Sequence, residues 1–163
     1  TTGIAQRAGI TLASLYRYFP NKTAVIRAVA ERQLRRLDAH FEEFLLDFDF
    51  DRGLERLLDT YAEFYRTEPG YVEIWSGVQA IPELAELDLL DLQRHAMRIS
   101  ERALMRDPEL DRVRLEAASM MLSRACAAVL RLAMTMPPEK ASALVAEAKF
   151  MARVYIRDRF PRR

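Results

Sequence analysis

The sequence is poor in the residues that cross-link a fold or bind metals. It contains one cysteine, which excludes a disulfide within the chain and suits a reducing, cytoplasmic compartment. Its two histidines, His40 and His95, lie too far apart in sequence to give a metal-ligand spacing. No glycine-rich phosphate loop, secretory signal or apolar run of the ~20 residues that a membrane span needs is present. We therefore expect a soluble protein with no metal, cofactor or membrane partner.

The residues that are present favour a helical protein with a substantial core. Hydrophobic residues make up 50% of the chain and charged residues 30%, which argues against disorder. Apolar residues recur at spacings of three and four, as one buried helix face requires. The fold class expected is therefore all-α. The expected helices are residues 2–8, 12–18, 22–46, 53–67, 71–78, 83–106, 109–135 and 138–159.

Several of these helices have a start signal in the sequence. Thr11 and Asn21 can each cap the helix that follows, by accepting a hydrogen bond from a free backbone N–H group. Pro108 and Pro138, each followed by a glutamate, suit a first helical turn, where the helix dipole favours negative charge.

The charge is distributed unevenly along the chain. Residues 1–36 contain seven basic side chains and one acidic side chain, although the whole chain has a net charge of only +1. The remaining residues therefore have a net negative charge. A basic segment attached to an acidic body indicates a polyanionic partner at one end.

The first 22 residues have the sequence logic of a helix-turn-helix unit. A short helix ends near Ala8, Gly9 can adopt the left-handed conformation of a sharp turn, and Thr11 begins a second helix. The second helix of such a unit lies in the major groove of DNA. The small core of the unit is expected to consist of Ile4, Ile10, Leu15 and Phe19.

The outward face of the second helix then provides the candidate DNA contacts. Arg17 is the best candidate for guanine, because its planar fork matches O6 and N7. Leu12 and Ala13 can contact only thymine methyl groups or exclude other bases by shape. Phosphate contacts, which fix the register on DNA, are expected from Ser14, Tyr16, Tyr18 and Lys22.

The string Ile4-Ala5…Ala8-Gly9-Ile10-Thr11…Ser14-Leu15-Tyr16-Arg17-Tyr18-Phe19-Pro20-Asn21-Lys22 resembles the N-terminal signature of the TetR family of bacterial repressors. The resemblance implies that Thr11 caps the recognition helix. It implies that Tyr16, Tyr18 and Lys22 hold the DNA backbone, with help from Thr2. It also implies an all-helical C-terminal body that binds a small inducer and dimerises.

Two features depart from that signature. Such domains normally have a further helix ahead of residue 1, so we expect the sequence to lack its first residues and Ile4 and Leu15 to be partly uncovered. Gly3 lies inside the first expected helix, where glycine costs ~1 kcal/mol relative to alanine.

The expected domains are a helix-turn-helix domain at residues 1–36 and an effector-binding and dimerisation domain at residues 37–163.

The last two expected helices are the natural dimer interface. The last helix has an apolar stripe that runs from Ala141 to Ile156, and the preceding helix has the small-residue run 125–128, which permits close helix approach. Together they could form a four-helix bundle across a two-fold axis. The alternative is that both stripes pack within one subunit.

The middle helices are expected to hold the inducer. Trp75 is the best single candidate, because Gly70, Ser76 and Gly77 leave space around it. Arg66, Arg94, His95 and Arg98 could face a ligand, although charged helix positions are usually solvated. Apolar residues of this kind are more often plain core than ligand contacts. The expected lining residues are Tyr61, Phe64, Tyr65, Trp75, Met97, Met120 and Met121.

These features predict a non-enzymatic, dimeric regulator of the TetR type. It would bind pseudo-palindromic operator DNA and leave it when a small apolar or aromatic inducer binds. The alternative is a helical small-molecule-binding protein or enzyme with no DNA role.

The acidic run at residues 47–51 resembles the start of a calcium loop, but Arg52 and Leu58 stand where such a loop needs glycine and glutamate.

Overall fold

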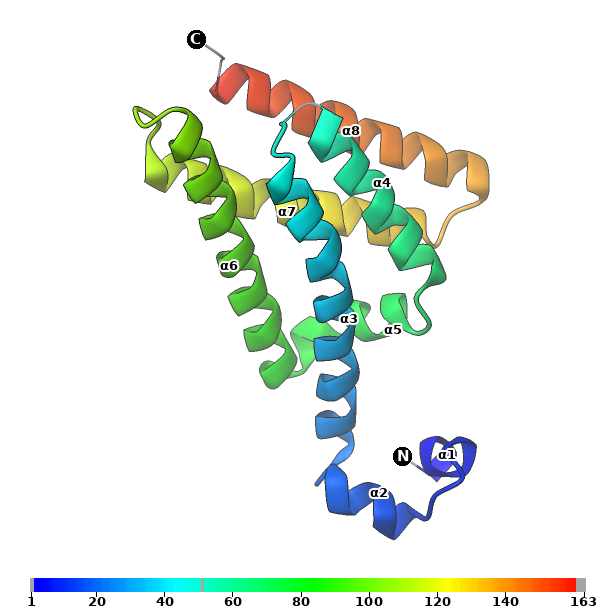
Figure 1. The fold of residues 1–163 in the computed structure, drawn as a ribbon. Coiled ribbons are helices and arrows are strands. Elements are labelled where there is room, and N and C mark those ends of the chain that lie inside the picture. The colour runs from blue at the N-terminus through cyan, green and yellow to red at the C-terminus, as the bar shows by residue number, and fades with distance from the viewer. Residues whose placement is uncertain (1, 51, 161–163) are drawn as a thin grey trace.

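The computed structural model describes residues 2–50 and 52–160, apart from the side chain of Gln79. These residues form helices and turns with no strand, which confirms the expected all-α fold (Figure 1). The helices are α1 (Thr2–Arg7), α2 (Leu12–Tyr18), α3 (Lys22–Leu46), α4 (Arg52–Thr67), α5 (Tyr71–Ser76), the 3₁₀ helix η1 (Val78–Ala80), α6 (Pro82–Arg106), α7 (Arg112–Ala133) and α8 (Pro138–Arg159).

Helix α3 links two parts of the molecule. Its first turns carry α1 and α2 at one end, and its later turns pack against α4, α5 and α6 in a helical body (Figure 1). In that body α6 packs on α7, and α7 runs antiparallel to α8. The predicted boundary between residues 36 and 37 falls inside α3, so one continuous helix passes from one part to the other. No helix in the described ranges is long and apolar enough to cross a bilayer.

The helix starts follow local chemistry. The Thr11 side chain accepts a hydrogen bond from the Ser14 N–H group at 3.1 Å, and the Asn21 side chain accepts one from Ala24 at 2.8 Å. Gly9 has φ +66°, the left-handed conformation that the tight turn between α1 and α2 requires. Both predicted caps and the predicted turn are therefore confirmed, and Pro138 also begins α8 as expected.

The predicted start of α7 at residue 109 was wrong, because the helix begins at Arg112. Asp107 accepts a hydrogen bond from the Glu109 N–H group at 3.1 Å, which keeps Pro108 and Glu109 in a turn. The Asp111 side chain then caps α7 by accepting from the Arg114 N–H group at 3.2 Å. An aspartate with this cap geometry overrides the proline signal three residues earlier.

Two apolar clusters hold the body together. The larger joins residues from α3 through α8, including the fully buried Ala30, Leu84 and Leu130. The second lies at the other end of α3 and contains Phe41, Phe44, Leu45, Phe48, Ala103 and Leu115. Burying each large apolar side chain contributes ~1.5–3 kcal/mol before conformational entropy is counted. The body is therefore stabilised by the apolar side chains that its long helices bury between them.

The core of the α1–α2 unit is much smaller. Ala5 and Leu15 are buried, Phe19 is half-buried, and Ile4 and Ile10 keep 46% and 41% of their surface exposed. The expected four-residue core is therefore only partly closed. Ile4 is uncovered as predicted, whereas the expectation that Leu15 is also uncovered was wrong.

Candidate nucleic-acid interface and ligand cavity

The outward face of α2 is rich in polar and aromatic side chains. Tyr18 is the most exposed of them, at 70%, and Tyr16 and Leu12 are also exposed. The Arg17 guanidinium lies 5.2 Å from the centre of the Tyr18 ring, so the two side chains form one basic and aromatic edge. Among the other predicted contact residues, Thr2, Thr11, Ala13 and Lys22 are exposed, and Ser14 is half-buried.

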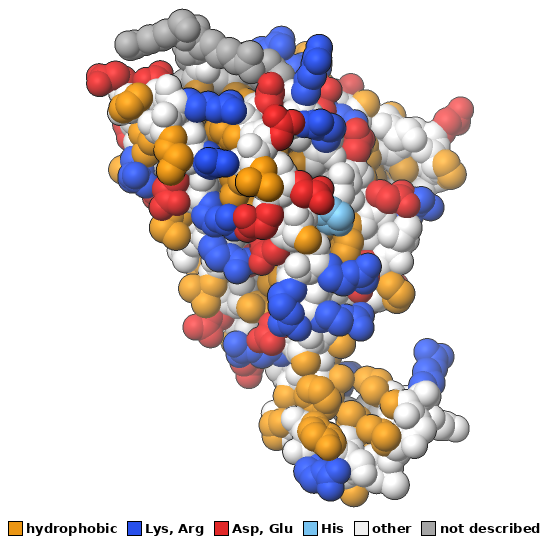
Figure 2. Space-filling model, viewed as in Figure 1, with side chains coloured by type: hydrophobic (Ala, Val, Ile, Leu, Met, Phe, Trp, Pro, Cys, Tyr) orange, Lys and Arg blue, Asp and Glu red, His pale blue; other side chains and the backbone are white. Residues whose placement is uncertain are grey.

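Three of the basic side chains at this end have no acidic partner among the described residues. No carboxylate of the described residues forms an ion pair with Arg7, Arg17 or Lys22. Further along α3, Arg27 pairs with Glu31 at 2.9 Å. More basic side chains lie on α3 above α2 (Figure 2). An uncompensated basic end beside an exposed short helix suits a phosphate backbone.

The body contains a cavity of about 150 Å³ that residues of six helices, α3 to α8, line. One part of its lining is aliphatic and aromatic, with Leu37, Phe41 and Phe44 from α3. Another part is formed by Tyr61, Tyr65, Tyr71 and Trp75 from α4 and α5. Its acidic, basic and histidine lining residues are Asp88, Asp91, His95, Arg124 and Arg131. A largely apolar cavity with a few polar groups is the usual form of a small-molecule site.

Two known family patterns match the sequence. Residues 1–29 match "Bacterial regulatory proteins, tetR family", and residues 49–155 match "Tetracyclin repressor-like, C-terminal domain". The chain belongs to the TetR family. It is therefore a regulator with an N-terminal helix-turn-helix DNA-binding domain and a helical C-terminal domain, in a family where dimers and ligand binding are typical.

One curated relative shares part of this sequence. The nucleoid occlusion factor SlmA of Glaesserella parasuis serovar 5 (strain SH0165) is 29% identical over 77 residues. That match covers 47% of this chain and 38% of SlmA. The chain therefore matches well under two thirds of that relative's length. No solved structure matches the chain.

In this TetR-family chain, the cavity includes some of the predicted ligand residues. Tyr61, Tyr65 and Trp75 line it, whereas Phe64 is buried outside the lining against the Tyr71 ring, with centroids 5.6 Å apart. Met97 is 46% exposed, because α6 presents residues 88, 91, 92, 95 and 99 to the cavity and residue 97 falls on the opposite side. Met120 is half-buried and Met121 exposed, and the structure brings neither to the cavity.

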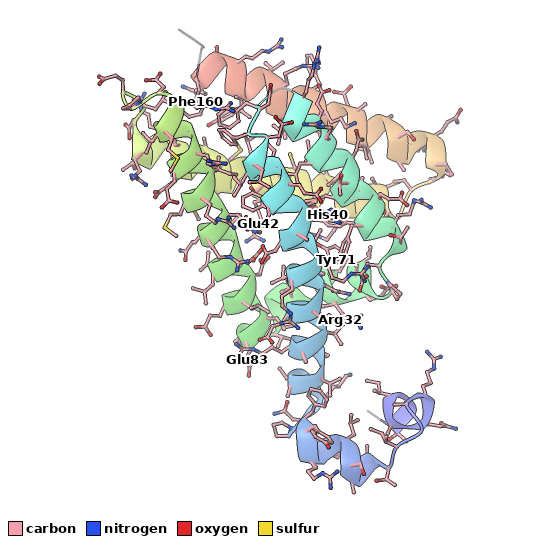
Figure 3. The ribbon with its side chains drawn as sticks, in the orientation of Figure 1. Arg32, His40, Glu42, Tyr71, Glu83 and Phe160 are labelled. Atoms are coloured by element: carbon pink, nitrogen blue, oxygen red, sulfur yellow. The ribbon has the colours of Figure 1, made fainter. Side chains whose placement is uncertain are left out.

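The predicted charged candidates divide in the same way. His95 lines the cavity, whereas Arg66 pairs with Glu63 at 2.6 Å on the surface. Arg98 forms an ion pair with Glu42, on the side of α3 that faces α6 (Figure 3). Sequence reasoning missed the contribution of α3 to the lining, although the spacing of Leu34, Leu37, Phe41 and Phe44 is that of one helix face.

A charged network joins α3 and α6 beside the cavity. His95 Nε2 lies 2.8 Å from an Asp38 carboxylate oxygen, and His95 Nδ1 lies 3.4 Å from an Asp91 oxygen. The Arg94 guanidinium contacts both carboxylates, at 2.8 Å and 2.5 Å. Burial raises the pKa of Asp91. Asp38, Asp91 and His95 are close enough for one metal ion, but Arg94 already supplies positive charge to both carboxylates.

The acidic run after α3 has local partners of its own. Asp47 pairs with Arg56 at 2.5 Å, and Asp49 accepts a hydrogen bond from the Arg52 N–H group at 3.2 Å. Asp51 lies outside the described residues. Asp47 and Asp49 thus fix the turn between α3 and α4.

Buried polar side chains attach α3 to the connection between α4 and α5. Trp75 Nε1 donates to Gln33 Oε1 at 2.9 Å, and Gln33 Nε2 donates to the Pro69 carbonyl oxygen at 3.3 Å. The buried Glu68 carboxylate pairs with both Arg36 and Arg32, which lies 3.2 Å away. Trp75 also lines the cavity, so one residue contacts both the cavity and α3.

Proposed function

We propose that this chain is a homodimeric transcriptional repressor whose operator binding ends when a small apolar or aromatic ligand enters the cavity. One observation carries the proposal. Helix α3 lines the cavity through Leu34, Leu37, Phe41 and Phe44, and the same helix carries α2 at its other end. A ligand that changes the position of α3 therefore also moves α2.

The proposed DNA contacts are those of the exposed α2 face and its flanks. Arg17 reads a base edge, and Leu12 and Ala13 limit the shape of the base pairs beside it. Backbone contacts come from Thr2, Thr11, Ser14, Tyr16, Tyr18 and Lys22. The absence of ion pairs to Arg17 and Lys22 within the described residues supports this division, since both charges are available to DNA.

A second copy of the chain is proposed to pack on α7 and α8. Leu132, Phe150 and Val154 are exposed apolar residues on these helices, and Ala128 is an exposed small one. Cys126 and Ala127 of the small-residue run line the cavity, and the buried Cys126 is not available to the partner. Two antiparallel helices from each copy would then form a four-helix bundle about a two-fold axis.

Release requires that the ligand binds one arrangement of the two α2 helices better than the other. Only such a difference in affinity can shift the equilibrium away from DNA. The hydrogen bond between Trp75 and Gln33 joins a cavity-lining residue to α3, and the ion pairs of Glu68 with Arg32 and Arg36 hold α3 to the α4–α5 connection. A ligand that displaces Trp75 would loosen the first of these contacts.

Salt-dependent DNA binding tests the proposal. The full chain is titrated against DNA duplexes from the region upstream of its own gene. Fluorescence anisotropy measures binding at 50 and 200 mM salt. With six or more phosphate contacts, the affinity should fall by about 10³-fold or more. Lys22→Gln should weaken binding to all sequences, whereas Arg17→Ala should mainly reduce the preference for one base position.

Arg114→Ala is the matched control for Arg17→Ala. It also removes one arginine side chain, but Arg114 lies on α7 in the body, away from α2. It should leave DNA affinity unchanged. Binding that is equally weak for all duplexes and indifferent to salt would contradict the DNA role and favour a helical small-molecule-binding protein or enzyme.

A further inference from the structure

The charged side chains of the cavity wall are paired within the protein, with one exception among the described residues. Asp88 pairs with Arg124 at 2.5 Å. Asp91 is held by Arg94 at 2.5 Å and by His95. For Arg131, in contrast, no carboxylate of the described residues lies within ion-pair distance. Arg131 therefore brings a positive charge to the lining that these residues do not neutralise.

The surroundings of Arg131 are built for an anion. Arg131 lines the same cavity as Tyr65 and Tyr71, and its positive charge lowers the pKa of both phenol groups, although burial outweighs this effect. Burial raises the pKa of Tyr65 and of Tyr71, so both hydroxyls stay protonated at neutral pH. The two hydroxyls hydrogen-bond to each other, which leaves one O–H group that can donate to an oxyanion.

The rest of the cavity suits an apolar body. Tyr65 and Tyr71 stack with ring centroids 4.1 Å apart, and Tyr71 lies 5.9 Å from Trp75. Leu37, Phe41 and Phe44 line another part of the wall. The cavity volume of about 150 Å³ matches that of an apolar cavity that holds a benzene ring. One ring or a short branched chain is therefore the size that fits.

We infer that the ligand of this cavity is a small organic acid, with its carboxylate held by Arg131 and its ring-sized apolar body among the Tyr, Phe and Leu side chains. This inference rests on the proposed ligand-binding role and specifies its chemistry. A guanidinium binds a carboxylate through two parallel hydrogen bonds, which a neutral or cationic analogue cannot form.

The experiment compares matched probes on the full chain. Phenylacetate, its amide and phenethylamine share a ring and differ in charge, and benzoate with benzamide forms a second, shorter series. Binding is measured by calorimetry and by the shift in melting temperature. The acids should bind about 10- to 100-fold more tightly than their amides, the range expected for a hydrogen-bonded charge pair. The amine should bind most weakly.

Variants then assign the effect to one side chain. Arg131→Gln should remove the preference for the acid and leave the amide affinity unchanged, whereas Arg131→Lys should keep part of it. Arg114→Gln, an exposed arginine outside the cavity, is the control and should change nothing. Circular dichroism confirms that each variant is folded. An acid preference that survives Arg131→Gln would overturn the assignment.

The remaining outcomes separate this inference from the function on which it rests. If the amides or the amine bind as well as the acids, the cavity is a ligand site and the carboxylate inference is wrong. If no probe binds while DNA binding stays intact, the proposed inducer role fails as well. If DNA binding fails but the acid preference depends on Arg131, the inference holds and the repressor role does not.

Discussion

The α1–α2 end and the helical body bury their apolar residues to very different extents. In the end unit, Ala5 and Leu15 are enclosed, while Ile4 and Ile10 keep close to half of their surface exposed. In the body, Leu84 and Leu130 are fully buried within a cluster that spans α3 to α8. The body is thus stabilised by long-range packing, and the end unit by caps, a tight turn and a small core.

This difference also separates the two kinds of function. The end presents its chemistry outward, on neighbouring residues of one short helix. The body keeps its chemistry inside, on residues drawn from α3 to α8. A change in the body should therefore alter stability and ligand binding, whereas a change in the end unit should alter DNA binding with little effect on stability.

The largest expected effect is the loss of a core side chain in the body. Leu130→Ala should lower the free energy of unfolding by about 2–5 kcal/mol, because Leu130 is fully buried and leaves a cavity. Ile10→Ala, the matched change in the end unit, should cost less than about 1 kcal/mol, because Ile10 is 41% exposed. Urea denaturation followed by circular dichroism measures both. Equal losses would show that the two regions share one core.

The end unit could be predicted from the sequence because its determinants are local. Gly9, Thr11 and Asn21 act within three residues of their own positions, so the turn and both caps were visible in the sequence. The start of α7 was missed for a local reason too, since Asp111 and Pro108 are competing signals and only the geometry shows which one prevails.

The cavity could be predicted only in part. Tyr61, Tyr65 and Trp75 are aromatic residues on the middle helices and line the cavity, whereas Phe64, a candidate on the same ground, does not. Met97 and Met121 are predicted as lining residues on residue type alone. Both lie on faces of α6 and α7 that are exposed and do not line the cavity. The contact of Asp38 with His95, and the presence of Arg131 and Tyr65 in one cavity lining, depend on how α3, α4, α6 and α7 cross, which no sequence period records.

The second comparison uses thiol chemistry in the two regions. Burial raises the pKa of Cys126 to about 11 from an ordinary value of 9.0. At pH 8 its thiolate fraction is therefore about 100-fold lower than that of an unburied thiol, and its reaction with a disulfide reagent should be slower by a similar factor. In a Cys126→Ser background, Gln6→Cys places a thiol on the exposed α1 and should react at the ordinary rate. If Cys126 reacted as fast, the body would have to open readily in solution.

The smallest expected effects come from two glycines of the end unit, and they should have opposite signs. A Cβ atom at Gly3 or at Gly9 would meet nothing within 4 Å, so packing cannot distinguish the two positions. Backbone conformation can, because Gly3 is helical and Gly9 has φ +66°. Gly3→Ala should stabilise α1 by about 0.5–1 kcal/mol, and Gly9→Ala should destabilise the turn by about 1 kcal/mol or slightly more.

Hydrogen exchange of the α1 and α2 amides reports this local effect, since global unfolding depends mainly on the body. If Gly9→Ala also destabilised the body by the same amount, α1 and α2 would have to unfold together with it, and the contrast between the two regions would not hold.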